Sequence, residues 1–339
     1  MSSGDDVRKA QALVWAQTVL NQAVNLLPLA GDASFRRYFR VNSADEQYVL
    51  MDAPPNRENV QPFLAVRDWM QQAGLRVPQL IAADAEQGFL LLEDFGDVTW
   101  AAYLQADGGP DGNIRPLFAD ALRQLHLLQT CIPEPPLEAF DVARMQRECE
   151  LLLDWYLPHV AQHTLRQHER DFFHAKLLPW LEQIAALPRV PVHLDYHSRN
   201  LMLPGGNHPP LAVIDFQDAF NGPVTYDLAS LLYDCYQDYP EALRRRISGD
   251  FFTALPMETS EYFTGFDDWH RALRLTAMQR HIKAIGIFSR LAFRDGKRQF
   301  LDEIPLTRKH LGEEIAALGL FSVAEDVVVR RLLIGQTAE

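Results

Sequence analysis

Hydrophobic and polar positions follow different periods along this chain, and the change of period predicts two regions. In the N-terminal part, apolar residues recur at helical spacing over residues 13–27, and Pro28 is expected to end that helix. A second amphipathic helix is expected over residues 63–70, with Gly74 after its end. Short apolar and aromatic runs predict strands over residues 35–41, 47–51, 77–82 and 89–92.

From residue 96 onward the helical period dominates. Helices are expected over residues 117–128, 145–156, 172–187 and 269–293. Strand patterns in this part cover residues 192–194, 201–203 and 211–216. The sequence therefore predicts an α+β fold class with two lobes. A small β-rich N-lobe with one main helix is expected over residues 1–95, and a larger, mostly helical C-lobe over residues 96–339.

Composition narrows the partners and the compartment. The 339 residues include 32 Lys and Arg against 45 Asp and Glu, a net charge of −13, which argues against a nucleic-acid partner. The three cysteines form no C-x-x-C pair, so we expect neither a disulfide framework nor a zinc site. No segment has the ~18 apolar residues of a membrane helix, and the acidic start is not typical of a signal peptide. We expect a cytoplasmic protein without a membrane partner.

The strongest chemical signal lies in residues 190–200, which contain the pattern H-x-D-x-x-x-x-N. Twenty positions after Asp195, an apolar strand runs into Asp215. Kinase-type phosphotransferases use these parts in this order. Asp195 is the predicted catalytic base, which accepts the proton of an attacking hydroxyl. Asn200 and Asp215 are predicted to hold Mg²⁺, a hard cation that prefers oxygen ligands, and His193 is expected to hold the loop.

This loop, the strand over residues 213–216 and the segment over residues 222–229 together resemble the aminoglycoside phosphotransferase family. Members of that family are relatives of the choline kinases and have a protein-kinase-like, two-lobed fold. The resemblance covers most of the chain and implies ATP and Mg²⁺ as cofactors. It also implies a structural role for Asp227, which is expected to cap the following helix and to fix the catalytic loop.

Residues 31–41, 49–55 and 286–291 resemble a narrower branch of that family. Its members are bacterial kinases that phosphorylate the anomeric hydroxyl of N-acetylmuramate and N-acetylglucosamine. The resemblance implies a small-molecule sugar substrate and a sugar 1-phosphate product for cell-wall recycling, passed on to a sugar-1-phosphate nucleotidyltransferase. Two alternatives stay open: a kinase of the same fold for an aminoglycoside, choline or homoserine, and a non-catalytic kinase-like binding module.

One position departs from the family pattern. The second strand usually carries a Lys that pairs with ATP phosphates, and residues 48–51 contain none. We hypothesise that Arg36, Arg37 or Arg40, on the preceding strand, replaces it. Because side chains alternate along a strand, Arg37 must face opposite to the other two. Glu58 is available as the helix Glu that normally pairs with the Lys, and without the Lys its role is open.

Two further segments are expected to contact the nucleotide. The turn that contains Gly31 and Ser34 offers backbone N–H groups and a hydroxyl to phosphate oxygens. The connector after the last N-lobe strand contains Glu93 and Phe95. In the architecture that the resemblance implies, the Glu93 carbonyl and the Phe95 N–H bind adenine.

The candidate substrate residues lie far along the chain. Arg280 and Lys283 are three positions apart in an apolar helical pattern, so they can face one site. A carboxylate, such as the lactyl acid of N-acetylmuramate, would suit them. The alternative for each residue is an ordinary solvated helix face.

Overall fold

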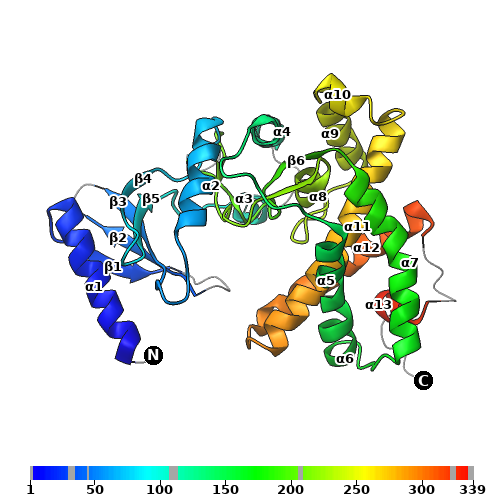
Figure 1. Cartoon of the computed structure of the whole chain (residues 1–339), viewed down its shortest axis with the longest axis horizontal. Helices are drawn as coiled ribbons and strands as arrows, with labels where there is room; N and C mark the ends of the chain where they lie inside the picture. The colour runs from blue at the N-terminus through cyan, green and yellow to red at the C-terminus, as the bar shows by residue number, and fades with distance from the viewer. Residues whose placement is uncertain are drawn as a thin grey trace.

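The computed structural model describes residues 3–29, 35–43, 46–106, 114–204, 209–320 and 326–334. Figure 1 shows a sheet with two helices at one end of the molecule and a larger group of helices at the other. The predicted division at residue 95 falls in the segment between the last strand of this sheet and the first helix of the helical part.

The N-lobe contains one antiparallel five-stranded sheet, with the strand order β1-β2-β3-β5-β4. Its strands are β1 (Asn25–Pro28), β2 (Arg37–Asn42), β3 (Gln47–Asp52), β4 (Leu80–Asp84) and β5 (Phe89–Glu93). In the register of β2 and β3, Tyr38 lies opposite Met51 and Arg40 lies opposite Val49. The four predicted strands are therefore present, with boundaries shifted by up to three residues.

The helix predicted to end at Pro28 begins and ends earlier in the chain than expected. Helix α1 (Ser3–Leu20) is followed by Asn21, which has a left-handed φ of 50°. Asparagine tolerates this conformation better than most residues, so it suits a helix end. Residues 25–28 form the edge strand β1 instead, where Leu26 is buried and Pro28 needs no ladder partner for a backbone N–H.

A helix covers each face of the sheet. Ala12 and Ala16 of α1 pack on one face, in an apolar cluster with Phe39, Val41 and Leu50. Helix α2 (Gln61–Gln72) packs on the other face with the buried side chains of Phe63, Val66, Trp69 and Met70. Gly74, with a φ of 88°, follows the end of α2 as the sequence predicts. The second cluster continues into the C-lobe, so the two lobes share one core.

The C-lobe is mostly helical. Its helices are α3 (Trp100–Ala106), α4 (Arg115–Thr130), α5 (Val142–Leu151), the π-helix η1 (Leu152–Tyr156), α6 (Leu157–His159), α7 (Gln167–Ala186), α8 (Tyr226–Leu232), α9 (Glu241–Thr253), α10 (Met257–Ser260), α11 (Phe266–Phe293), the 3-10 helix η2 (Arg298–Glu303), α12 (Ile304–Leu318) and α13 (Val327–Ile334). Helix α11 runs through the centre of this lobe and packs on α5, α12 and η1 (Figure 1). The four predicted helices are present.

Two small antiparallel sheets interrupt these helices. Strand β6 (Arg189–Val192) pairs with β9 (Phe220–Pro223), and β7 (Leu201–Met202) pairs with β8 (Ala212–Val213). The strand predicted over residues 192–194 ends earlier because Leu194 has a left-handed φ of 74°. Strand β9 was not expected from the sequence. Among the described residues, no helix is both long and apolar enough to cross a membrane.

Candidate active site

The predicted catalytic loop connects β6 to β7, and two buried carboxylates hold its backbone. Asp227 of α8 accepts hydrogen bonds from the backbone N–H groups of His193 at 2.7 Å and Leu194 at 3.0 Å. Asp234, which follows α8, accepts one from the N–H of Ser198 at 2.9 Å. Both side chains are fully buried. The loop is therefore fixed on both sides of Asp195, by one carboxylate inside α8 and by another just after this helix.

Asp227 fixes the loop as predicted, but it does not cap the helix. The N-cap residue of α8 is Thr225, and Asp227 lies inside the first turn. Its carboxylate points to the loop because the N–H groups of His193 and Leu194 have no strand partner at that point. Burial raises the pKa of Asp227 to about 6, which leaves it ionised at neutral pH.

Within the loop, His193 and Asn200 support Asp195. The buried His193 accepts a hydrogen bond from the backbone N–H of Asp195 through Nδ1 at 3.2 Å, and its Nε2 lies 3.0 Å from the carbonyl oxygen of Ile214. The side-chain amide of Asn200 donates to the carbonyl oxygen of Asp195 at 3.0 Å. His193 thus holds the loop, as expected from the sequence.

Positive charges keep Asp195 ionised. Burial on its own would raise the pKa of this carboxyl, but the charges of Lys283, His197 and Arg280 outweigh burial and lower it below its ordinary value. A carboxylate that stays ionised is able to accept a proton. Lys283 and Arg280 come from α11, so the helix predicted to hold the substrate residues does approach the predicted base.

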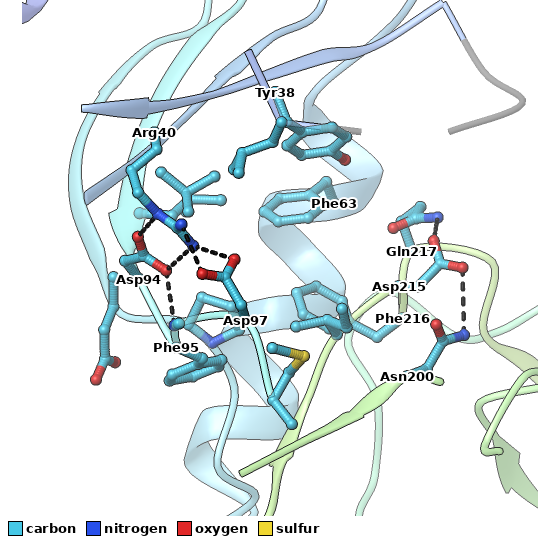
Figure 2. Close-up of a pocket in the computed structure, with 18 residues that line it drawn as sticks. Tyr38, Arg40, Phe63, Asp94, Phe95, Asp97, Asn200, Asp215, Phe216 and Gln217 are labelled. Atoms are coloured by element: carbon cyan, nitrogen blue, oxygen red, sulfur yellow. Dashed lines mark hydrogen bonds and ion pairs between the residues drawn. The ribbon is translucent and has the colours of Figure 1, made fainter. Parts of the chain in front are cut away.

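Asn200 and Asp215 lie together, as the metal prediction requires (Figure 2). The Asn200 Nδ2 atom is 3.4 Å from the Asp215 Oδ2 atom, and Gln217 donates to the other Asp215 oxygen at 2.8 Å. Asp215 has a left-handed φ of 64°, which turns the chain sharply after β8. An amide oxygen and a carboxylate fit Mg²⁺, which often takes one or two protein ligands and completes its shell with water and phosphate oxygens.

The described residues contain no group of three or more His, Cys, Asp or Glu side chains suited to a metal ion. A metal cage built from three or more of these four residue types is therefore absent from the described residues. The pair formed by Asn200 and Asp215 fits a metal ion that arrives with a phosphate ligand.

A cavity of about 360 Å³ lies between the lobes, and both predicted metal ligands line it. Apolar side chains come from the N-lobe (Leu29, Val49, Phe63, Leu92) and from the C-lobe (Met202, Ile214, Phe216). The connector residues from Glu93 to Asp97 close one side, and Figure 2 shows Asn200 and Asp215 on the opposite side. Its size and mixed lining are typical of a small-molecule site.

The connector itself is held by ion pairs. Arg40 of β2 contacts Asp94 at 2.5 Å and Asp97 at 2.9 Å (Figure 2). The Glu93 carboxylate forms an ion pair with Arg76. The predicted adenine contact uses the backbone carbonyl of Glu93 and not this side chain. Glu93 and Phe95 both line the cavity, as their predicted adenine contacts require.

The three arginines considered as replacements for the missing Lys occupy different places. Arg36 lies one residue before β2 and pairs with Glu58 at 3.4 Å, just before α2. Arg40 is engaged by Asp94 and Asp97. Arg37 contacts the buried Asp52 and stacks 5.7 Å from the Phe39 ring, on the α1 side of the sheet. Alternation along the strand therefore points Arg37 away from the cavity. This position does not fit its predicted role as a nucleotide ligand.

Arg36 keeps its charge in this position. Burial would lower the pKa of its guanidinium, but the neighbouring Tyr38 hydroxyl and Glu58 carboxylate raise it above the ordinary value, with Asp218 contributing. Asp218 is three residues beyond the predicted metal ligand Asp215. Gly31 and Ser34, the other predicted phosphate ligands, lie outside the described residues.

Arg280 and Lys283 are not on a solvated face. Arg280 is 7% exposed, and its guanidinium carbon lies 5.5 Å from the centre of the Tyr226 ring. The Lys283 ammonium lies 3.5 Å from a Glu148 oxygen and 3.4 Å from the Tyr226 hydroxyl. Gln279 donates to the second Glu148 oxygen at 3.2 Å. These residues of α5, α8 and α11 form a buried polar cluster beside the catalytic loop.

The sequence reasoning missed two contributors. Asp234 has no motif of its own, although it follows Asp227 by seven positions, about two helical turns. Glu148 is 135 positions before Lys283 in the chain and carries no local signal. Both are identified only through the packing of α5 and α8 around the loop and α11.

A β-rich lobe, a helical lobe and an Asp–Asn–Asp set on the intervening loops define a kinase-like phosphotransferase. The chain belongs to the phosphotransferase enzyme family, whose model matches residues 25–262.

Relatives agree with this assignment. The N-acetylmuramate/N-acetylglucosamine kinase of Pseudomonas putida is 37% identical over 93% of this chain and 95% of its own length. The kinase of the same name from Pseudomonas aeruginosa is 38% identical over 92% of this chain and 93% of its own. Among solved structures, Plasmodium vivax ethanolamine kinase matches with a TM-score of 0.61 at 12% identity, covering 90% of this chain and 87% of that one, which shows a common fold.

Proposed function

We propose that this chain is an ATP- and Mg²⁺-dependent kinase that phosphorylates the anomeric hydroxyl of N-acetylmuramate and N-acetylglucosamine. The observation that carries the proposal is the convergence of the Asp195 loop with Asn200 and Asp215 at one side of the interlobe cavity. The acceptor comes from the printed names of the relatives, which match almost the whole chain. The class of reaction comes from the family.

In this proposal the cavity holds the nucleotide. Adenine lies between the apolar side chains of the two lobes, donates a hydrogen bond to the Glu93 carbonyl and accepts one from the Phe95 N–H. The turn with Gly31 and Ser34 remains a predicted phosphate contact. Arg36, held by Glu58, is the proposed replacement for the missing Lys, because alternation puts it on the same side as Tyr38 and Arg40, which line the cavity, whereas Arg37 contacts Asp52.

Five side chains carry the proposed reaction, as base, metal ligands and loop anchors. Asp195 accepts the proton of the sugar hydroxyl as its oxygen attacks the terminal phosphorus, and ADP leaves. Asn200 and Asp215 hold the metal ion, which neutralises phosphate charge when it is bound. Asp227 and Asp234 keep the loop in place, so that the base and the metal ligands hold a constant geometry.

The test is an acceptor panel with Mg-ATP, read by ADP release. The panel contains N-acetylmuramate, N-acetylglucosamine, an aminoglycoside, choline and homoserine, and phosphorus NMR locates the phosphate on the product. The 1-O-methyl glycoside of N-acetylglucosamine is the matched control, because its anomeric oxygen is blocked. We expect turnover of the two free sugars only. Turnover of a cationic acceptor, or of the blocked glycoside, would contradict the proposed acceptor, and no turnover at all would favour a binding module.

The cellular setting follows from the same proposal. A sugar 1-phosphate is a substrate for a nucleotidyltransferase that forms a nucleotide sugar, so we propose such an enzyme as the next step of cell-wall recycling. ATP and this product both belong to the cytoplasm, where we place the reaction.

A further inference from the structure

Arg280 is a buried cation whose hydrogen-bonding capacity is incompletely used. Its side chain lies on α11, nine-tenths buried, with the guanidinium over the Tyr226 ring. The Nε and Nη1 atoms are buried and have no hydrogen-bond partner among the residues that the structure describes. Burying a charged donor without a partner costs free energy, so such a group is expected to gain a ligand.

The groups that face Arg280 do not satisfy it. Lys283, one helical turn further on, has Glu148 at 3.5 Å as its own counter-charge. Asp234 accepts hydrogen bonds from the backbone N–H groups of Ser198 and Tyr236, at 2.9 Å each. The charges of Asp195 and Asp234 act on Arg280 over a distance, but neither forms an ion pair with it in the part of the chain described. Among the described residues, Arg280 therefore has no carboxylate at ion-pair distance, whereas Lys283 has Glu148.

We propose that Arg280 binds a carboxylate on the acceptor sugar and so makes N-acetylmuramate a better acceptor than N-acetylglucosamine. This inference rests on the proposed function. The two sugars differ only in the lactyl ether of N-acetylmuramate, which carries an ionised carboxylate. That ether is attached at C3, two ring positions from the anomeric carbon whose hydroxyl meets Asp195.

The chemistry of the guanidinium fits this ligand. Two parallel N–H donors match the two oxygens of a carboxylate, and such charge-assisted pairs are among the strongest hydrogen bonds in proteins. Arg280 is almost fully buried, and an ion pair is stronger in a buried site than in water. Lys283 does not take the same role, because Glu148 and the Tyr226 hydroxyl already engage its ammonium group. The sequence treats Arg280 and Lys283 as equivalent candidates for this carboxylate. In the inference, Arg280 alone binds it, because Lys283 already has partners.

The decisive experiment compares both sugars in Arg280→Met, which keeps a long apolar side chain in the buried position. We expect kcat/KM for N-acetylmuramate to fall about 10- to 100-fold, the scale of one hydrogen bond to a charged group. The value for N-acetylglucosamine is expected to fall less, because the Arg280 charge also helps to keep Asp195 ionised with either sugar, so the ratio of the two values should fall about tenfold. Arg271→Met is the matched control, because Arg271 is an exposed arginine nine positions earlier on α11. It should leave the ratio of the two values unchanged.

A second variant and a second measurement separate recognition from folding. Arg280→Lys keeps the charge and loses the fork, so it should restore part of the preference. Affinities of both sugars, measured by calorimetry on wild type and Arg280→Met, do not depend on turnover. If wild type binds N-acetylmuramate more tightly and the variant loses only that advantage, the inference holds even where the proposed reaction fails. Equal losses for both sugars, or an unchanged ratio, would overturn it.

Discussion

The Asp227 carboxylate lies 3.0 Å from the backbone nitrogen of Leu194 and accepts its hydrogen bond, while Leu194 has a left-handed φ of 74°. A non-glycine residue pays about 1 kcal/mol or more for this conformation. Asp215 has the same kind of backbone, with a φ of 64°. Leu194 directly precedes the predicted base, Asp215 is itself a predicted metal ligand, and the buried Asp227 holds Leu194 in place. The backbone conformation that positions Asp195 therefore lowers the stability of the folded state.

This relationship predicts the pH dependence of turnover. The pKa of Asp227 is about 6, because burial raises it, whereas positive charges hold the pKa of Asp195 below its ordinary value. As pH falls through 6, Asp227 gains a proton and loses part of its hold on the loop, while Asp195 is still ionised. We expect kcat, measured at saturating Mg-ATP and sugar, to fall below about pH 6.

Asp227→Asn tests this assignment. The amide accepts at one oxygen only, so kcat at pH 8 should fall about 10- to 100-fold, the scale of one lost hydrogen bond to a charged group. The acid decline near pH 6 should disappear from the remaining activity. An identical midpoint in the variant would assign the decline to another group.

Asp195→Asn should remove most turnover and leave nucleotide binding nearly unchanged. The amide keeps the shape of the side chain but cannot accept the proton, and general-base catalysis is usually worth about 10²- to 10⁴-fold. Turnover with sugar and binding of an ATP analogue are measured side by side. Near-normal turnover would exclude Asp195 as the base.

The two predicted metal ligands should differ in strength. Asp215→Ala removes a charged ligand that lies at the cavity wall, so Mg²⁺-dependent nucleotide affinity and activity should be lost together. Asn200→Ala removes a neutral ligand and should have a smaller effect on affinity. Magnesium titrations of nucleotide binding measure both, and a wild-type response in Asp215→Ala would contradict the metal assignment.

The arginine that replaces the Lys can be identified from ATP kinetics. Arg36→Ala should raise the KM for ATP about tenfold, the scale of one charge-assisted contact. Arg37→Ala is the matched control, because Arg37 is the next residue but faces Asp52 on the α1 side of the sheet. Its KM for ATP should stay near that of wild type, although its ion pair with a buried acid makes some loss of stability expected. A larger effect of Arg37 would reverse the assignment.

Local patterns could predict the parts of the site that are close in sequence. Asp195 and Asn200 lie on one loop, so their spacing alone places them together, and the strand before Asp215 supplies the third member. Strand alternation correctly set Arg37 apart from Arg36 and Arg40, but it could not say which face meets the cavity. That choice depends on α1, which covers the other face.

Other features depend on tertiary packing and carry no local signal. The apolar residues near Leu26 continue the helical period of α1, yet they form strand β1. The helix ends before Asn21, and the Leu26 side chain packs in the apolar cluster of the sheet. Glu148 neutralises Lys283 across 135 residues of chain, so their pairing appears only when α5 packs against α11. The same packing distinguishes Lys283 from Arg280.

The closeness of that packing is set by Gly286 on α11. A Cβ atom at this position would lie 2.4 Å from the carbonyl carbon of Leu151 and 2.5 Å from the nitrogen of Leu152, at the junction of α5 and η1. Backbone atoms on both sides cannot move aside as a flexible side chain would. Gly286→Ala should therefore destabilise the protein by about 1–3 kcal/mol, the usual cost of overpacking, despite the better helix propensity of alanine. Denaturant unfolding measures the change.

Gly249 of α9 supplies a matched control with the opposite expected sign. It also lies inside a helix, but a Cβ atom there would meet only the Phe266 ring, at an ordinary 3.6 Å. Gly249→Ala should therefore be neutral or stabilise the protein by up to about 1 kcal/mol, through helix propensity and a less flexible unfolded chain. Because α11 also carries Arg280 and Lys283, Gly286→Ala should in addition weaken sugar turnover, whereas Gly249→Ala should not. Equal stability changes in the two variants would show that the close approach at Gly286 is not what limits this position.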